Sequence, residues 1–204
     1  MKTAQVKITG QAPYTQSRFH GEAKLPREGS EDYENRTWPG KAHLNEAEQV
    51  TIPALAFKKC LAEAAKYLSE QIPGKGKSTY TKHFQSGVIV LTDSVVAYKG
   101  QPVTSALLDV PKSGYYGNRM FVPSDGVAGS GKRVFRTFPT VADGWECAVK
   151  FLIMDDIITQ PVFEKHLTMA GLLIGVGAFR VRNGGVMGRF QSEILSWTED
   201  KELA

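Results

Sequence analysis

The stretch Gly171–Trp197, GLLIGVGAFRVRNGGVMGRFQSEILSW, carries six glycines and three arginines in a short space. An apolar, helix-like run precedes the glycines, and Gly188–Trp197 alternates apolar and polar residues after them, as a strand does. Glycine allows tight turns and close backbone approach, and closely spaced arginines suit a polyanion. We therefore interpret the segment as a loop between a helix and a strand that contacts phosphates. A loop that only reverses the chain also fits.

The order of elements around the glycines excludes two nucleotide-binding motifs. Gly175–Gly185 lies between a helix and a following strand, whereas the dinucleotide fingerprint lies between a strand and a following helix. Gly126–Arg133, GVAGSGKR, fits GxxxxGK, but Arg133 occupies the position where Ser or Thr binds magnesium. The residues after it predict a strand rather than the helix of a P-loop. We interpret this second loop as flexible and directed towards phosphates, with solvated charge as the alternative.

The rest of the chain supplies the partners of this loop. Alternation predicts strands, and apolar residues at three- and four-residue steps predict helices. Thr159 is a candidate N-cap, and Pro53 suits a first helical turn. The expected strands are 3–10, 88–98, 118–125, 145–156 and 188–197, and the expected helices are 51–72 and 162–174. The segment 24–48 is charged and aperiodic, so we expect a loop there.

This order predicts an α+β fold with a ferredoxin-like (RRM-like) βαββαβ core, in which helices cover one sheet face. We expect one domain over residues 1–204, with a core of 1–72 and 139–198 and a β-rich insertion at 73–138. Hydrophobic residues make up 42% of the chain, enough for a core. Cys60 and Cys147 are expected as buried free thiols. No signal peptide or membrane-spanning run is evident, so we expect a cytoplasmic protein with no membrane partner.

The basic residues gather in loops, although the net charge is only +4. Pro73–Phe84, PGKGKSTYTKHF, mixes cations with aromatic rings, a combination that suits single-stranded nucleic acid. An ordinary exposed loop is the alternative. The candidate binding residues in this loop are Lys75, Lys77, Tyr80, Lys82 and His83. Those in the second basic loop are Lys132, Arg133 and Arg136.

The histidines give no metal site, because their spacing to one another and to the cysteines fits no ligand set. We therefore expect no metal and no other cofactor. His20 or His43 could act as a general base on a ribose hydroxyl, as in metal-independent RNA cleavage. A non-catalytic role is the commoner use of such a histidine.

Two segments together resemble the RAMP superfamily, the backbone subunits and guide-processing nucleases of CRISPR effector complexes. Ile52–Leu68, IPALAFKKCLAEAAKYL, resembles the first helix of these proteins. Ile174–Phe190, IGVGAFRVRNGGVMGRF, is similar to their glycine-rich signature before the last strand. The resemblance covers residues 3–20, 51–72 and 145–197. A stand-alone relative from a phage or another mobile element fits as well as a subunit of a complex, either way in a bacterial or phage-infected cell.

The resemblance implies a core that assembles side by side along single-stranded RNA. It implies that Lys58 and Lys59 face the RNA backbone, and that the glycine-rich loop contacts phosphates through Arg180, Arg182, Gly184, Gly185 and Arg189. It also implies that the insertion forms a thumb-like hairpin, and that Tyr14 and Arg18 lie near the groove. The phosphate contacts need no covalent chemistry.

The sequence thus favours a sequence-independent binder of single-stranded RNA, or of single-stranded DNA, that forms a homo-oligomer or filament and contacts other effector subunits. Two alternatives stay open. One is a metal-independent endoribonuclease that uses His20 or His43, and the other is a protein–protein module that mimics a backbone subunit.

Overall fold

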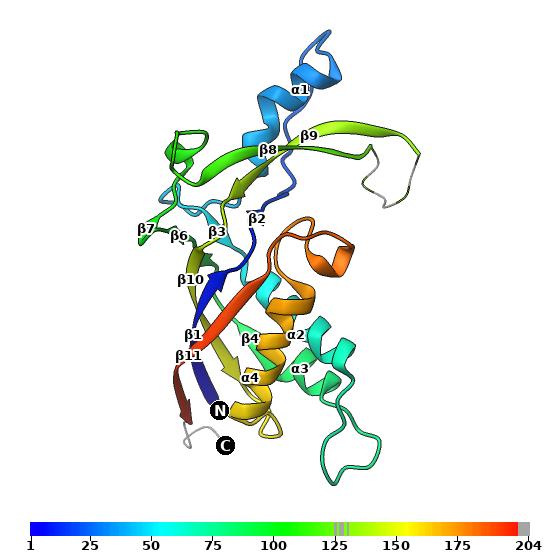
Figure 1. The fold of residues 1–204 in the computed structure, drawn as a ribbon, viewed down its shortest axis with the longest axis vertical. Coiled ribbons are helices and arrows are strands. Elements are labelled where there is room, and N and C mark those ends of the chain that lie inside the picture. Colours follow the sequence, from blue (N-terminus) through cyan, green and yellow to red (C-terminus); the bar gives the residue numbers. More distant parts are fainter. Residues whose placement is uncertain (125, 127–128, 130, 200–204) are drawn as a thin grey trace.

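The computed structural model describes residues 1–124, 126, 129 and 131–199. Its main sheet is built on β1 (Lys2–Gly10), which pairs antiparallel with β10 (Trp145–Ile153) and with β11 (Phe190–Glu199). β4 (Val88–Val90) and the short strand β6 (Ala97–Tyr98) add to the other edge of β10, and β7 (Gln101–Pro102) pairs with β6. The fold is therefore mixed α and β with antiparallel sheets (Figure 1).

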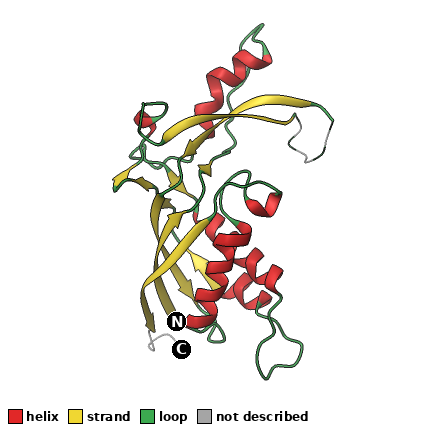
Figure 2. Ribbon diagram, in the orientation of Figure 1, coloured by secondary structure: helices red, strands yellow, loops and turns green. Residues whose placement is uncertain are grey.

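The alternation of β1 decides which sheet face becomes the core. Ala4, Val6 and Ile8 are fully buried, whereas the residues between them are half-buried on the opposite face. Helices cover only the buried side, as Figure 2 shows. These helices are α2 (Ala54–Leu68), α3 (Thr81–Gly87) and α4 (Gln160–Met169), which continues as the π-helical turn η3 (Ala170–Ile174).

Both long helices predicted from the sequence are present. The buried face of α2 carries Phe57, Leu61 and Ala64 at the predicted three- and four-residue steps. Thr159 is the N-cap residue of α4, although its side chain makes no capping hydrogen bond. Pro53 is the N-cap residue of α2 and so lies one position before the predicted first turn. Cys60 and Cys147 are buried free thiols, as expected.

A second, smaller sheet carries a long hairpin away from the main sheet. β8 (Tyr115–Pro123) and β9 (Arg133–Val141) pair along nine residues, and β2 (Tyr14–Thr15) adds to β9. We call β8 and β9 the hairpin. It projects beyond the end of the main sheet (Figure 1). Two further pieces are a short ladder of β3 (Thr51–Ile52) with β5 (Ser94–Val95) and the 3₁₀ turn η2 (Ser105–Leu107).

The expected loop at 24–48 contains the helix α1 (Ser30–Thr37) and the 3₁₀ turn η1 (Trp38–Lys41). An eight-residue helix is too short to show a clear period, and tertiary contacts hold it instead. Glu34 of α1 pairs with Lys41 and with Arg136 of β9. Its carboxylate also accepts a hydrogen bond from the backbone N–H of Thr137 at 2.9 Å.

The expected strand at 88–98 is divided into β4, β5 and β6, which lie in two different sheets. Asp93 explains the break, because its carboxylate accepts a hydrogen bond from the backbone N–H of Ala54 at the start of α2. Part of the range 73–138 therefore belongs to the main sheet, through β4, β6 and β7. Within the described residues, no helix has the length and apolar character needed to cross a membrane.

Candidate nucleic-acid interface

The glycine loop (residues 175–189) is compact because its two ends cross at close range. The backbone N–H of Val176 donates to the Gly188 carbonyl at 2.9 Å, and the Gly188 N–H donates to the Pro13 carbonyl at 2.8 Å. Gly188 has φ +69°, and a Cβ built on it would lie 1.8 Å from the Val176 carbonyl oxygen. Only glycine fits there. The loop is thus fixed to the segment between β1 and β2.

The two glycines expected to contact phosphates differ in their surroundings. Gly184 is exposed with φ +77°, and nothing lies within 4 Å of an added Cβ. Gly185 is half-buried, and an added Cβ would lie 1.8 Å from the Phe179 carbonyl oxygen. Gly184 is therefore open to a ligand, whereas Gly185 allows the loop to pack on itself.

The three arginines of the loop also differ. Arg180 forms an ion pair with Glu63 of α2 at 3.2 Å, and its side chain is only 18% exposed. This engagement argues against the expected role of Arg180 in contacting phosphates. Arg182 and Arg189 are exposed and form no ion pair with the described residues. Arg189 lines a pocket of about 370 Å³ with Gln11 and Leu172.

The glycine loop meets the base of the hairpin. The rings of Phe179 in the loop and Phe138 in β9 pack edge to face, with centroids 4.9 Å apart. The ammonium group of Lys41 lies 4.6 Å from the Phe138 ring centroid, and the Arg18 N–H donates to the Lys41 carbonyl at 2.9 Å. The contacts place Arg18, the hairpin base and the glycine loop next to one another.

Two aromatic residues near the contact between the glycine loop and the hairpin differ in exposure. Phe19 is 89% exposed beside Arg18, which makes it a candidate for base stacking that the sequence interpretation left out. Tyr14, expected near the groove, is buried, and its hydroxyl donates to the Thr51 carbonyl. Burial also raises the pKa of Tyr14 far above its usual range. Tyr14 is a core residue.

The hairpin carries an arrangement of arginines over aromatic rings that the sequence interpretation also missed. Phe121 and Phe135 are opposite each other in the β8–β9 register, and both rings are more than half exposed. Arg119 lies over the Phe135 ring at 4.7 Å, and Arg133 lies over the Phe121 ring at 5.3 Å. The sequence signal for this arrangement is an arginine two residues before a phenylalanine in each strand, RMF at 119–121 and RVF at 133–135.

The three expected cations of the second basic loop have different partners. Arg136 pairs with Glu34 at 3.1 Å, and Arg133 donates to the Phe121 carbonyl at 2.6 Å. The Lys132 side chain is exposed and makes no hydrogen bond or ion pair with the described residues, although its backbone carbonyl accepts a hydrogen bond from the Ser124 N–H at 2.9 Å. Of the P-loop-like segment 126–133, residues 127, 128 and 130 lie outside the described residues.

The basic loop at 73–84 lies at the opposite end of the molecule from the hairpin (Figure 1). Lys75, Lys77 and Lys82 are exposed there. Tyr80 was expected to stack on bases, but it is only 5% exposed and packs on His166. His83 is held by Asp155, 2.6 Å away. The structure therefore corrects the view that this loop offers an aromatic surface, because its rings belong to the core.

Two lysines of α2 were expected to face the RNA backbone. Lys59 is exposed and lies one helical turn before Glu63, the residue that anchors the glycine loop. Lys58 is half-buried. Lys59 is thus on the side of α2 that the glycine loop contacts.

The candidate catalytic histidines lie near the junction of hairpin and glycine loop. His43 is half-buried, and burial followed by the charge of Arg18 lowers its pKa below the usual value. His20 packs against Tyr33 with ring centroids 6.2 Å apart, and its Nδ1 is buried with no hydrogen-bond partner among the described residues. Within the described part of the chain, no group of three or more potential metal ligands comes together.

Comparison with known proteins gives a likeness in fold. No protein-family model matches the sequence, and no curated protein matches it. A chain in the cryo-EM structure of the type III-B Cmr-beta bound to cognate target RNA superposes with a TM-score of 0.55 at 12% identity. The protein shares the fold of this Cmr-beta chain. The match covers 97% of the protein and 61% of the Cmr-beta chain, so the protein spans less than two thirds of its neighbour.

A second structure, Cmr6 from Pyrococcus furiosus, matches with a TM-score of 0.48 at 15% identity, over 94% of the protein and 98% of Cmr6. The resemblance to CRISPR effector subunits expected from the sequence is confirmed as a likeness in fold to the Cmr-beta chain.

Proposed function

We propose that this protein binds single-stranded RNA, without sequence preference, along the side where the glycine loop meets the hairpin. The observation that carries the proposal is the contact between Phe179 and Phe138, which joins two basic segments far apart in the sequence. Arg18, bonded to the Lys41 backbone beside Phe138, and Arg182, three residues after Phe179, have no acidic partner among the described residues. Cations of this kind neutralise phosphates, and the exposed Phe19 ring offers a surface for a base.

The fold supports the same proposal by analogy. The neighbouring Cmr-beta chain belongs to an assembly bound to target RNA. Function does not follow from fold alone, so the site residues carry the argument. The strand order β11-β1-β10-β4, with two long helices on one face, supports a ferredoxin-like assignment of the core.

We also propose that several copies, or one copy with other effector subunits, line up along the strand with the hairpin as the thumb-like contact to a neighbour. The hairpin is suited to such a contact because it extends beyond the main sheet, where a neighbouring copy can reach it (Figure 1). Size-exclusion chromatography of the protein with a long and a short RNA tests this. Particles whose size grows with RNA length support side-by-side assembly, and one protein per RNA at every length contradicts it.

The location of the interface is tested with two matched double variants and a labelled single-stranded RNA. Arg18→Ala with Arg182→Ala should weaken binding at least tenfold, since each removes a phosphate contact. Lys75→Ala with Lys77→Ala removes the same charge at the opposite end and should bind like the wild type. Equal losses in both would overturn the location. Incubation with the RNA in EDTA separates binding from metal-independent cleavage. Intact RNA supports binding alone, and cleaved RNA supports a nuclease that uses His20 or His43.

A further inference from the structure

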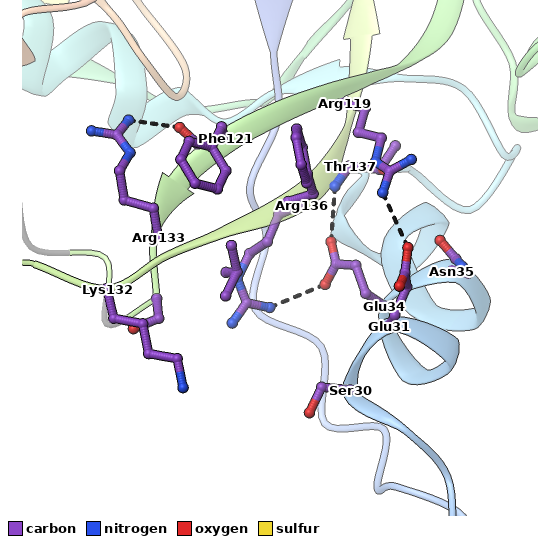
Figure 3. A pocket seen from close by; sticks show the side chains of 13 residues that line it. Ser30, Glu31, Glu34, Asn35, Arg119, Phe121, Lys132, Arg133, Arg136 and Thr137 are labelled. Atoms are coloured by element: carbon purple, nitrogen blue, oxygen red, sulfur yellow. Dashed lines mark hydrogen bonds and ion pairs between the residues drawn. The ribbon is translucent and has the colours of Figure 1, made fainter.

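A pocket of about 480 Å³ lies between α1 and the hairpin, away from the glycine loop. Figure 3 shows Ser30 and Asn35 of α1 on one side and Phe121 and Arg133 of the hairpin on the other, with Arg119 reaching across to Glu31. Pockets of roughly 300–1,000 Å³ are the usual size for small ligands. The volume is therefore enough for one small molecule or for one unit of a polymer.

The hairpin wall of the pocket is made of planar groups. Phe121 and Phe135 form a cross-strand pair with ring centroids 5.0 Å apart, and the two rings are 51% and 57% exposed. The guanidinium groups of Arg119 and Arg133 lie over these rings. Aromatic rings and guanidinium planes are the surfaces on which nucleobases stack in proteins. This wall is suited to a flat, polarisable ligand.

The charges around the pocket favour an anion. Among the described lining residues, each carboxylate already has a cation of its own: Glu31 pairs with Arg119, and Glu34 pairs with Arg136. Arg133 and Lys132 remain without an acidic partner among the described residues. Figure 3 places both of them on the side of the pocket opposite Ser30 of α1. Two positive charges that no described carboxylate pairs with, beside stacked rings, suit a phosphate attached to a base.

Glu34 holds the two walls in place. Its side chain is only 7% exposed and accepts hydrogen bonds from Arg136 and from the Thr137 backbone N–H. Burial alone would raise the pKa of Glu34, but hydrogen bonds from Lys41 and the Thr137 amide hold it below its usual value. The carboxylate is therefore ionised at neutral pH and ties α1 to β9. The pocket is formed before any ligand arrives, which lowers the entropic cost of binding.

We propose that this pocket binds one nucleoside monophosphate unit, with the base on the Phe121–Phe135 pair and the phosphate beside Lys132 and Arg133. The unit belongs either to a free nucleotide or to one residue of a bound strand, and only the second case rests on the function proposed above. The chemistry of recognition is the same for both sources.

Calorimetric titration of the full chain with adenosine 5′-monophosphate, adenosine and ribose 5-phosphate tests the pocket. Adenosine 5′-monophosphate should bind at least about tenfold more tightly than adenosine or ribose 5-phosphate, since stacking and phosphate contacts both contribute. Phe121→Leu with Phe135→Leu should weaken the monophosphate about tenfold and leave ribose 5-phosphate unchanged. Lys132→Ala should weaken the monophosphate and leave adenosine unchanged.

Lys75→Ala, at the opposite end of the molecule, is the matched control for a lost lysine and should bind the monophosphate like the wild type. Leucine keeps the hairpin face apolar, and a thermal melt of the double leucine variant checks that it folds. Absence of monophosphate binding by the wild type, or wild-type binding by the folded leucine variant, overturns the proposal.

A competition experiment identifies the source of the ligand. If saturating monophosphate weakens binding of a labelled single-stranded oligonucleotide, the pocket takes one residue of the strand. If both bind together, the pocket takes a free nucleotide. Monophosphate binding in a protein that binds no oligonucleotide would refute the function proposed above and leave the pocket standing.

Discussion

The guanidinium of Arg180 in the glycine loop and the carboxylate of Glu63 on α2 form an ion pair at 3.2 Å. This contact fastens the loop to the helix that covers the sheet. Arg182, two residues further on, is exposed and has no ion pair within the described residues. Two arginines that are alike in the sequence therefore have different roles: Arg180 holds the loop, and Arg182 is available to a ligand.

We predict that Arg180→Ala lowers stability while Arg182→Ala lowers RNA affinity. Glu63 is partly exposed, so solvent screening limits the cost of losing the pair to about 1 kcal/mol of unfolding free energy. Urea unfolding and RNA titration of both variants check this. A stable Arg180→Ala protein that has lost RNA binding would show that Arg180 contacts the ligand directly.

Two glycines of the loop should respond very differently to alanine. Gly188→Ala places a Cβ against the Val176 carbonyl oxygen at a positive φ, so we expect a loss above about 3 kcal/mol or failure to fold. Gly184→Ala has the same backbone strain but open space around it, and should cost about 1 kcal/mol. Thermal melts of the pair measure the difference, and equal losses would mean that the close crossing of the loop ends is not required.

Glu34 is the residue on which the docking of α1 depends. In Glu34→Gln the ammonium group of Lys41 stays buried without its counter-charge, which typically costs about 3 kcal/mol. We expect α1 to detach from β9, seen as faster proteolysis between residues 21 and 41. Glu31→Gln, which removes the exposed pair with Arg119, is the control and should change the cleavage rate little. Similar rates for both variants would contradict a central role of Glu34.

His166 should make stability fall in mild acid. It is fully buried and stacked on Phe84, and burial lowers its pKa below the ordinary value of 6.5. The unfolded chain therefore takes up the proton first, so stability is complete above that value and declines as the pH falls below it. Melts between pH 7.5 and 5 should show a smaller decline in His166→Gln. Phe84→Leu disturbs the same stack without removing the titrating group, so an equally reduced decline there would contradict the assignment.

Periodic segments were predictable from the sequence, and segments held by tertiary contacts were not. α2 and β1 bury a regular stripe of apolar residues, which is why their positions follow from the pattern alone. α1 depends on Glu34 reaching β9, about a hundred residues away in the chain, and no local pattern reports such a contact. The break after β4 depends in the same way on Asp93 bonding to the start of α2.

The sequence predicted the types of residue in the candidate site but not the side chains that these residues contact. The sequence shows a cation at Arg180 and an aromatic ring at Tyr80, and both are types of side chain that bind RNA. It does not show that Glu63 pairs with Arg180, or that Tyr80 packs on His166. The sequence interpretation missed Phe19 and the Phe121–Phe135 pair because apolar residues in strand-like segments are usually buried, whereas these three rings are exposed.

The salt dependence of RNA affinity tests the central claim most directly. For a single-stranded RNA, each phosphate contact should add about 0.7 to the slope of log affinity against log salt concentration. We expect a steep slope for the wild type, a slope smaller by about 1.4 for Arg18→Ala with Arg182→Ala, and no change for Lys75→Ala with Lys77→Ala. A flat wild-type plot, or the same reduction in both double variants, would contradict an RNA interface between the glycine loop and the hairpin.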